Sequence, residues 1–217
     1  MTSAPSLTWV IGRGGLLGQS VESAMGASVD HLGAGSDLWR PAQPIPWTES
    51  TAGARELGSR AEQFLRAAGD RPWSVAWCAG AGVTGTSAQA LDLELVALRE
   101  TLTALAAAPR PDKGAFFFAS SAGGVYAGVG TPPYDESSAV RPLAPYGRAK
   151  LDAEALVTDW SHRTGTPSLI GRISNLYGPG QNLAKAQGLI SQICRSHLTG
   201  QPLSIYVSLD TLRDYLF

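Results

Sequence analysis

The 217-residue sequence predicts an α/β fold in which helices cover both faces of a parallel, doubly wound sheet. Two observations predict this class. Short apolar runs typical of buried strands alternate with longer segments of helical periodicity along nearly the whole chain. A glycine-rich turn also joins the first strand-like run to the first helical segment. Strands that alternate with helices in this way pair in parallel, because each crossover returns the chain to the same edge of the sheet.

The first 70 residues supply two strands, two helices and one short additional strand. Leu7–Ile11 is apolar and bounded by glycine, as expected of a buried strand, and Gly15–Met25 repeats apolar residues at helical spacing. A second strand is expected near Ala27–Leu32. After a loop rich in glycine, proline and tryptophan, Ile45–Trp47 is a possible short strand, and Ala52–Ala68 is predicted to be helical.

The rest of the chain continues the alternation. The segment Ser87–Ala108 is predicted to be a helix that two following prolines stop, and Ala115–Ala119, with three consecutive phenylalanines, a strand buried on both faces. Prolines also precede the helix predicted at Tyr146–Ser161. The other predicted elements are strands at Trp73–Cys78 and Ser168–Ile173 and a helix at Ala184–Leu198.

The composition argues against several functional classes. Charged residues make up 16% of the chain, against about 25% in an average domain, and the net charge is -1, so nothing indicates a nucleic-acid or membrane surface. No signal peptide and no membrane-spanning run is evident, and a cytoplasmic location is expected. The histidines are scattered, so no metal site is predicted. Cys78 and Cys194 are expected to be reduced core residues.

Between the first strand and the first helix lies a loop that fits a dinucleotide. Its glycines stand at Gly12, Gly15 and Gly18. Gly12 permits the tight turn, Gly15 the close approach of a diphosphate, and Gly18 the packing of helix on strand. The helix N-terminus then offers free amide donors to the phosphates. NAD(P) is therefore the predicted cofactor, and Arg13, Leu16 and Leu17 belong to the same loop.

The choice between NAD and NADP stays open in the sequence. An acid at the end of the second strand would bind a ribose 2′-hydroxyl, yet Gly33 is expected there. Asp37 favours NAD, whereas Arg13 and Arg40 suit a 2′-phosphate. Both Asp37 and Arg40 are also compatible with solvated loop charges.

Tyr146 and Lys150 are four residues apart in a predicted helix, so they share one helical face. A lysine charge favours the ionised phenolate and is expected to lower the tyrosine pKa from about 10. Such a phenol can exchange a proton with an alcohol or a carbonyl. The chain has only three lysines against fourteen arginines, which favours a specific role for Lys150.

These motifs, in this order, resemble the extended short-chain dehydrogenase/reductases, and more narrowly the NAD-dependent epimerase/dehydratase family that acts on nucleotide sugars. The resemblance covers nearly the whole chain and includes a Rossmann fold. Besides the glycine loop, four segments carry it: Trp77–Ala81, Phe116–Tyr126, Glu136–Glu154 with the Tyr-x-x-x-Lys pair, and Arg172–Gly180. Arg213-Asp214-Tyr215 resembles a strand whose arginine contacts the substrate's diphosphate.

The resemblance implies a role for each matching residue. Tyr146 is implied as the acid/base, Lys150 as its partner and ligand of the nicotinamide ribose, and Ser121 (or Ser120) as the group that holds the reacting oxygen. Asn175 and Arg213, with Ser121, are implied in substrate binding, while Tyr126 is expected to pack. The cofactor site is implied to include the glycine loop, Tyr146, Lys150, Cys78, Ala79, Gly80, Ala119 and Ile173.

Two departures from the family pattern bear on these roles. The family's catalytic serine often lies three residues before the valine of a Val-Tyr pair, a position that Ala122 occupies here, and Ser121 reaches the site only if Gly123 and Gly124 let the loop bulge. The family usually continues beyond the Arg-Asp-Tyr strand, whereas the sequence stops at Phe217. We therefore expect a Rossmann domain over residues 1–172 and an incomplete substrate-binding lobe over residues 173–217.

The leading functional hypothesis is an NAD(P)-dependent epimerase-type enzyme acting on a nucleotide sugar. An NADPH-dependent reductase of a keto-sugar or another carbonyl is the second, and a non-catalytic dinucleotide-binding regulatory protein is the third. A dehydratase usually needs an acid/base pair beside the serine, where this chain has Gly123 and Gly124. The resemblance also implies a homodimer formed by the helices Ser87–Ala108 and Tyr146–Ser161.

Overall fold

The computed structural model describes residues 5–27, 36–46, 49–80, 82, 85–109, 111–130, 132–184, 188–205, 208 and 210–217. Within these residues, a five-stranded parallel sheet has the order β2-β1-β3-β4-β5. The strands are β1 (Ser6–Ile11), β2 (Ser36–Trp39), β3 (Trp73–Trp77), β4 (Gly114–Ser121) and β5 (Ser168–Ile173). The predicted α/β class with a doubly wound parallel sheet is confirmed.

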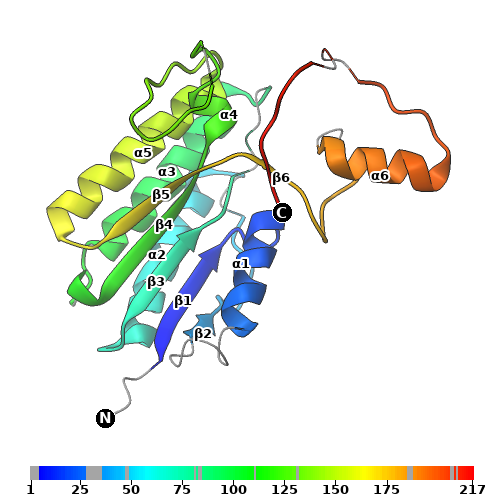
Figure 1. Cartoon of the computed structure of the whole chain (residues 1–217). Coiled ribbons are helices and arrows are strands. Elements are labelled where there is room, and N and C mark those ends of the chain that lie inside the picture. Colours follow the sequence, from blue (N-terminus) through cyan, green and yellow to red (C-terminus); the bar gives the residue numbers. More distant parts are fainter. Residues whose placement is uncertain are drawn as a thin grey trace.

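Helices cover both faces of this sheet (Figure 1). Of the long helices among the described residues, α1 (Leu16–Ala27) lies on one face, and α2 (Thr51–Ala68), α3 (Ala88–Leu105) and α5 (Pro145–Thr164) lie side by side on the other. This division follows from right-handed crossovers, because β1 connects to β2 in one direction and all later connections run in the opposite one. The short helix α4 (Ala122–Val125) follows β4 directly, and a 3₁₀ turn, Pro111–Lys113, precedes that strand.

Local signals start and stop the helices. Ser50 and Ser87 cap α2 and α3, their side chains accepting hydrogen bonds from the Gly53 and Ala90 amides at 3.1 and 3.4 Å. Helix α5 begins with a proline and ends at Gly165, whose φ of 72° only glycine adopts without strain.

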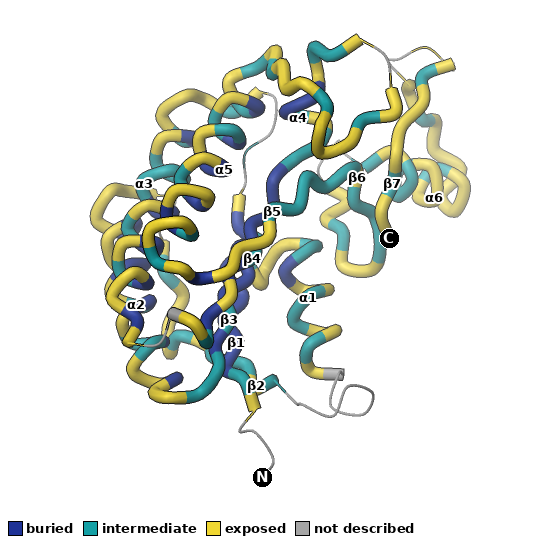
Figure 2. The backbone as a smooth tube through the Cα atoms, turned by 60° about the vertical axis from the view of Figure 1, so that its left-hand side comes forward, coloured by how far each residue is buried: buried dark blue, intermediate teal, exposed yellow. Residues whose placement is uncertain are grey.

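The core lies between the sheet and helices α2, α3 and α5, where the residues drawn as buried in Figure 2 gather. Phe64 of α2 packs against Trp9 and Trp73 of the sheet, and Trp160 of α5 packs against Phe116. All five of these aromatic side chains are at most 3% exposed. The long helices are therefore held by burial of an apolar face.

The C-terminal segment is organised differently. After β5, the strands β6 (Asn175–Leu176) and β7 (Tyr215–Leu216) form a separate parallel pair, and the amphipathic helix α6 (Leu189–Thr199) has no buried residue. This helix stands to one side of the main sheet (Figure 1). Cys194, on α6, is exposed, so the prediction that it belongs to the core is wrong.

Two predicted strands differ from the structure. Residues 28–35, which include most of the second strand predicted at Ala27–Leu32 and also Gly33, lie outside the described residues, and Ala27 ends α1 while the observed β2 begins at Ser36. In the possible strand Ile45–Trp47, Ile45 and Pro46 are irregular and Trp47 lies outside the described residues. Prolines on both sides of Ile45 remove the amide donors that a strand ladder needs.

Candidate active site

The glycine loop packs tightly against the end of β3. Gly12 has a φ of +92°, and a Cβ built there would lie 2.5 Å from the Ala79 amide nitrogen. A Cβ on Gly18 would lie 2.2 Å from the Gly12 carbonyl oxygen, whereas one on Gly14 would meet nothing within 4 Å. Gly12 and Gly18 are therefore fixed by packing, and the open side of the turn leaves its backbone accessible. These features fit a loop that holds a diphosphate at the N-terminus of α1.

The second strand places Asp37 and Arg40 differently. Asp37 pairs in register with Leu7, near the amino end of β1, and forms an ion pair with Arg71 at 2.8 Å. Arg40 directly follows β2 and forms an ion pair with Glu22 of α1 at 2.9 Å. Because ligands bind at the carboxyl ends of parallel strands, Arg40 is at the cofactor edge of the sheet and Asp37 is not.

Tyr146 and Lys150 lie in the first two turns of α5, on the side that faces the sheet. Lys150 is 9% exposed, and its Nζ donates a hydrogen bond to the Ala119 carbonyl oxygen at 3.1 Å. The same nitrogen lies 5.8 Å from the centroid of the Tyr146 ring. Two glycines flank this ring, since Cβ atoms on Gly82 and Gly124 would lie 3.2 and 3.1 Å from its carbons.

Ser121 completes this group. Its hydroxyl lies close enough to the Tyr146 phenol to favour the phenolate. The same hydroxyl accepts a hydrogen bond from the Gly124 amide at 3.2 Å, so Ser121 is the N-cap of α4. Helix α4 can approach α5 closely because Gly124 meets Gly147, on which a Cβ would lie 2.2 Å from the Gly124 oxygen. The structure thus brings Ser121 beside Tyr146, although Ala122 occupies the position expected for the serine.

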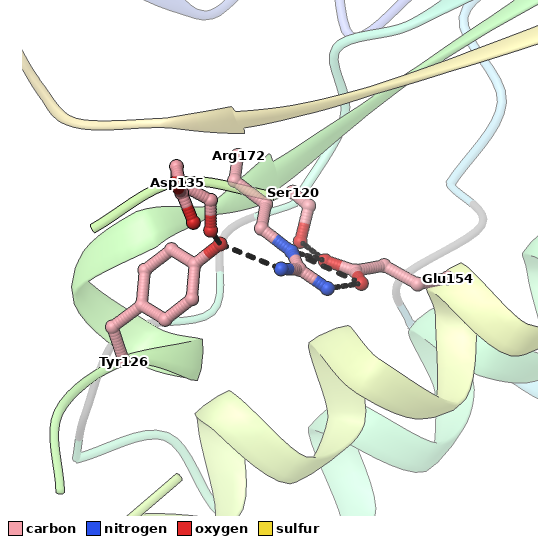
Figure 3. A network of polar contacts seen from close by, with 5 residues as sticks. All are labelled: Ser120, Tyr126, Asp135, Glu154 and Arg172. Carbon is pink, nitrogen blue, oxygen red and sulfur yellow. Dashed lines mark hydrogen bonds and ion pairs between the residues drawn. The ribbon is translucent and has the colours of Figure 1, made fainter. Parts of the chain in front are cut away.

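The Ser120 side chain does not contact Tyr146 in the same way but belongs to a network of polar contacts next to the site (Figure 3). It donates a 2.5 Å hydrogen bond to Glu154 of α5, which forms an ion pair with Arg172 of β5 at 2.7 Å. Arg172 also donates to the hydroxyl oxygen of Tyr126 at 2.6 Å, and that hydroxyl donates to the Asp135 carbonyl oxygen at 2.8 Å. The network joins β4, β5 and α5 and fixes the strand end that carries Ser121.

The electrostatics of the pair differ from the sequence prediction. Burial raises the pKa of Tyr146 above its ordinary value, the hydrogen bond from Ser121 opposes this, and the negative charge of Glu94 adds to it. Burial lowers the pKa of Lys150, against the opposing charges of Glu94 and Glu154. The prediction of a lowered tyrosine pKa is therefore wrong for this structure, because desolvation of the phenolate outweighs the other influences.

Glu94 of α3 is the group at this site that the sequence interpretation missed. It lines a small cavity of about 20 Å³ together with Tyr146, Lys150 and several apolar residues, Leu91 among them. The sequence of the predicted helix Ser87–Ala108 contains a feature that points to Glu94. Glu94 stands three residues after Leu91 and four before Leu98, both of which are buried, so it is a charged residue in the apolar stripe.

The loop after β3 connects the glycine turn to this cavity. Ala79 packs on Gly12, and a Cβ on Gly80 would lie 3.5 Å from Lys150 Nζ. Cys78, half-buried at the start of the loop, has a pKa raised to about 11 by burial. Residues 78–80, predicted to bind the cofactor, therefore run from the glycine loop to the lysine.

The residues predicted to bind substrate border a broad open cleft of about 1910 Å³, which Ser121 and Ile173 also line. Asn175 is exposed, and its Nδ2 donates to the Asp214 carbonyl oxygen at 3.0 Å, bridging to the segment that carries β7. Arg213 is exposed, and its Nη1 donates to the Leu212 carbonyl oxygen at 2.9 Å. Both residues line this cleft and not the small cavity that Glu94 lines.

None of the described helices is long and apolar enough to cross a lipid bilayer. In the same part of the chain, no three histidine, cysteine or acidic side chains are grouped as metal ligands.

The fold and the glycine turn define a Rossmann-type protein of the short-chain dehydrogenase/reductase class. More specifically, residues 11–217 match the profile of the NAD dependent epimerase/dehydratase family, and the chain belongs to that family. This confirms the resemblance drawn from the sequence.

Curated relatives match shorter stretches. The chain is 35% identical over 89 residues to a dTDP-glucose 4,6-dehydratase of Salmonella typhimurium, which covers 41% of this chain and 24% of that enzyme. It is 34% identical over 100 residues to a dTDP-4-dehydro-6-deoxyglucose reductase of Escherichia coli, covering 46% of this chain and 31% of the relative.

Solved structures share the fold over the whole chain. RMD from Pseudomonas aeruginosa, in complex with NADPH, superposes with a TM-score of 0.74 at 22% identity, covering 100% of this chain and 69% of that one. A UDP-glucose 4-epimerase from Thermotoga maritima, with UDP-glucose, gives a TM-score of 0.71 at 18% identity, covering 97% and 69%.

Proposed function

We propose that this chain carries the cofactor half and the acid/base of an NAD(P)-dependent, epimerase-type oxidoreductase acting on a nucleotide sugar. One observation carries the proposal: Tyr146, Lys150 and Ser121 converge at the end of β4, and the loop 78–80 connects them to the glycine turn. Membership of the family and its nucleotide-sugar relatives supports this substrate class.

The residues present fit a dinucleotide. The turn from Gly12 to Gly18 would hold the diphosphate, and Lys150 would reach the nicotinamide ribose. Ala119 lies near the end of β4, and Ile173 ends β5 beside it. A bound nicotinamide would accept a hydride from a sugar carbon or return one to it.

Proton transfer in this proposal belongs to Tyr146. Its raised pKa keeps the phenol protonated near neutral pH, so it can donate a proton to a carbonyl oxygen. Ser121, already within hydrogen-bond reach of the phenol, would hold the same oxygen and stabilise its developing charge. In the oxidative direction the ammonium of Lys150 would favour the phenolate that removes the hydroxyl proton. Helix α4, which reads Ala-Gly-Gly-Val, offers no acid for a dehydration.

Arg40 favours a second candidate, an NADPH-dependent reductase of a keto-sugar or another carbonyl. Its guanidinium stands at the carboxyl end of β2, where a 2′-phosphate would lie. Replacing Arg40 by alanine should weaken NADPH binding by about tenfold or more, the size of a charged hydrogen bond, and leave NADH binding nearly unchanged. Asp37→Asn is the matched control and should alter the binding of neither cofactor. Equal losses for both cofactors in the Arg40 variant would contradict the assignment.

One assay separates the two enzymes. With a nucleotide sugar, an epimerase gives an isomerised product and no net change in the absorbance of reduced nicotinamide, whereas a reductase consumes NADPH in proportion to product. Tyr146→Phe should abolish either reaction, and Ser121→Ala should slow it. If turnover persisted undiminished in the phenylalanine variant, the role of Tyr146 in both enzyme proposals would fail. If the unaltered chain bound the dinucleotide but turned over no nucleotide sugar, a non-catalytic dinucleotide-binding protein would remain.

Substrate binding is proposed for residues 173–217, as part of a lobe in which Asn175 and Arg213 face the sugar nucleotide. Ser121 contributes from the Rossmann part, residues 1–172. The cleft that all three residues line supports this proposal. A homodimer through α3 and α5 is proposed on the family resemblance.

A further inference from the structure

Helix α3 places a carboxylate inside the cavity that Tyr146 and Lys150 line. A Cβ on Gly80 would lie 3.4 Å from Glu94 Oε2 and 3.5 Å from Lys150 Nζ, so both charged groups reach the same point beside the Gly80 backbone. The other carboxylate oxygen, Oε1, accepts a hydrogen bond from the Gly82 amide at 3.1 Å. This bond fixes the Glu94 side chain in the cavity.

A lysine in this position needs a nearby negative charge. Lys150 is 9% exposed, and its ammonium lies 5.1 Å from the centroid of the Phe118 ring. Burial among such groups favours the neutral amine. A neutral amine would not favour the phenolate of Tyr146, so the catalytic pair depends on what keeps Lys150 charged.

Among the described residues, three ionisable groups are placed beside the lysine. Tyr146 and Glu154 come from its own helix and Glu94 from α3. Cys78, in the loop after β3, adds no charge near neutral pH, since burial raises its pKa to about 11. Glu154 shares its charge with Arg172, which lies 2.7 Å away. Glu94 is therefore the carboxylate best placed to act on the ammonium.

We propose that Glu94 is a positioning residue that keeps Lys150 protonated within the site. This inference rests on the proposed function for its consequence, but the charge relation can be measured without turnover. The same negative charge also disfavours the Tyr146 phenolate. Glu94 therefore keeps Lys150 charged and at the same time makes Tyr146 a weaker acid. Removal of the carboxylate should lower the pKa of both groups.

Lysine NMR tests the proposal directly, because the chain has only three lysines. Protein labelled with ¹³C at the lysine side chains is titrated with alkali, and Lys150→Arg identifies the Lys150 signal. In Glu94→Gln, which keeps an oxygen acceptor for the Gly82 amide, the Lys150 midpoint should move to lower pH. Asp92→Asn removes the same charge from an exposed position of α3 and should leave the midpoint in place.

The outcomes are distinct. An unchanged Lys150 midpoint in Glu94→Gln overturns the proposal, as does an equal shift in Asp92→Asn, which would reflect net charge alone. Should Glu94→Gln fail to fold, Glu94→Asp, which withdraws the carboxylate by one methylene, should give a smaller shift in the same direction, and no shift there overturns it equally. In the active enzyme, the alkaline limb of the rate profile should move to lower pH in Glu94→Gln. A shifted midpoint together with undiminished turnover in Tyr146→Phe would keep the charge relation and refute the catalytic function.

Discussion

Replacement of Gly147 by alanine tests the contact on which the site is built. Gly147 is a buried residue in the first turn of α5, and an added Cβ would lie 2.2 Å from the Gly124 oxygen and 2.8 Å from its carbonyl carbon. Real Cβ contacts essentially never fall below 3.0 Å, so α4 and α5 must separate by at least 0.8 Å, the difference between 3.0 and 2.2 Å. Backbone is on both sides of this contact, so no side-chain rotation relieves it.

The cost follows from two opposing effects. Overpacking costs about 1–3 kcal/mol, and the higher helix propensity of alanine returns about 1 kcal/mol. The free energy of unfolding should therefore fall by roughly 0–2 kcal/mol. Separation also moves Ser121 from Tyr146, and a displacement of about 1 Å costs about 100-fold in rate.

The assay is urea unfolding followed by the fluorescence of the six tryptophans, with turnover measured in parallel. Gly26→Ala is the control, because Gly26 is an exposed residue of α1 whose Cβ would meet nothing within 4 Å. That variant should gain up to about 1 kcal/mol. If Gly147→Ala matched the stability gain of the control and kept its activity, the close packing of α4 on α5 would be refuted.

Three other predictions follow from the structure. Glu154→Ala should lower the free energy of unfolding by about 3 kcal/mol, because it leaves Arg172 without its buried partner. In urea unfolding, the double variant Glu154→Leu/Arg172→Met should lose less stability than Glu154→Ala. Stability losses that simply add would argue against coupling of the two residues. Near neutral pH a thiol reagent should modify the exposed Cys194 quickly. It should modify Cys78 slowly, since a pKa of about 11 keeps the Cys78 thiol protonated. Fast modification of Cys78 in the Cys194→Ser variant would contradict this. Sedimentation velocity at micromolar concentration should show a dimer, and a monomer would remove the proposed pairing of α3 and α5.

Prediction from sequence succeeded where the signal is local. The glycine turn could be recognised because Gly12, Gly15 and Gly18 stand between a strand and a helix. The positive φ of Gly12 and the tight packing at Gly12 and Gly18 leave no room for a side chain at those two positions. Tyr146 and Lys150 share a helix face because of helical periodicity alone. The long helices and most strands follow from apolar patterning and caps for the same reason.

Prediction failed where distant segments decide the environment. The pKa of Tyr146 is raised because α3, α4 and the loop after β3 together bury it, and none of these is near it in sequence. Asp37 and Arg40 are three residues apart, yet the register of β2 places only Arg40 at the cofactor edge.

By itself, then, the sequence determined the doubly wound sheet, the cofactor turn and the tyrosine–lysine pair, because each depends on backbone conformation and periodicity within one short segment. Only the tertiary structure decided which serine meets Tyr146 and which carboxylate faces Lys150. Ser120 and Ser121 are adjacent in the chain, but Glu154 engages one and Tyr146 the other. The physical reason is that desolvation and charge depend on every segment that packs around a group, and only the folded chain brings those segments together.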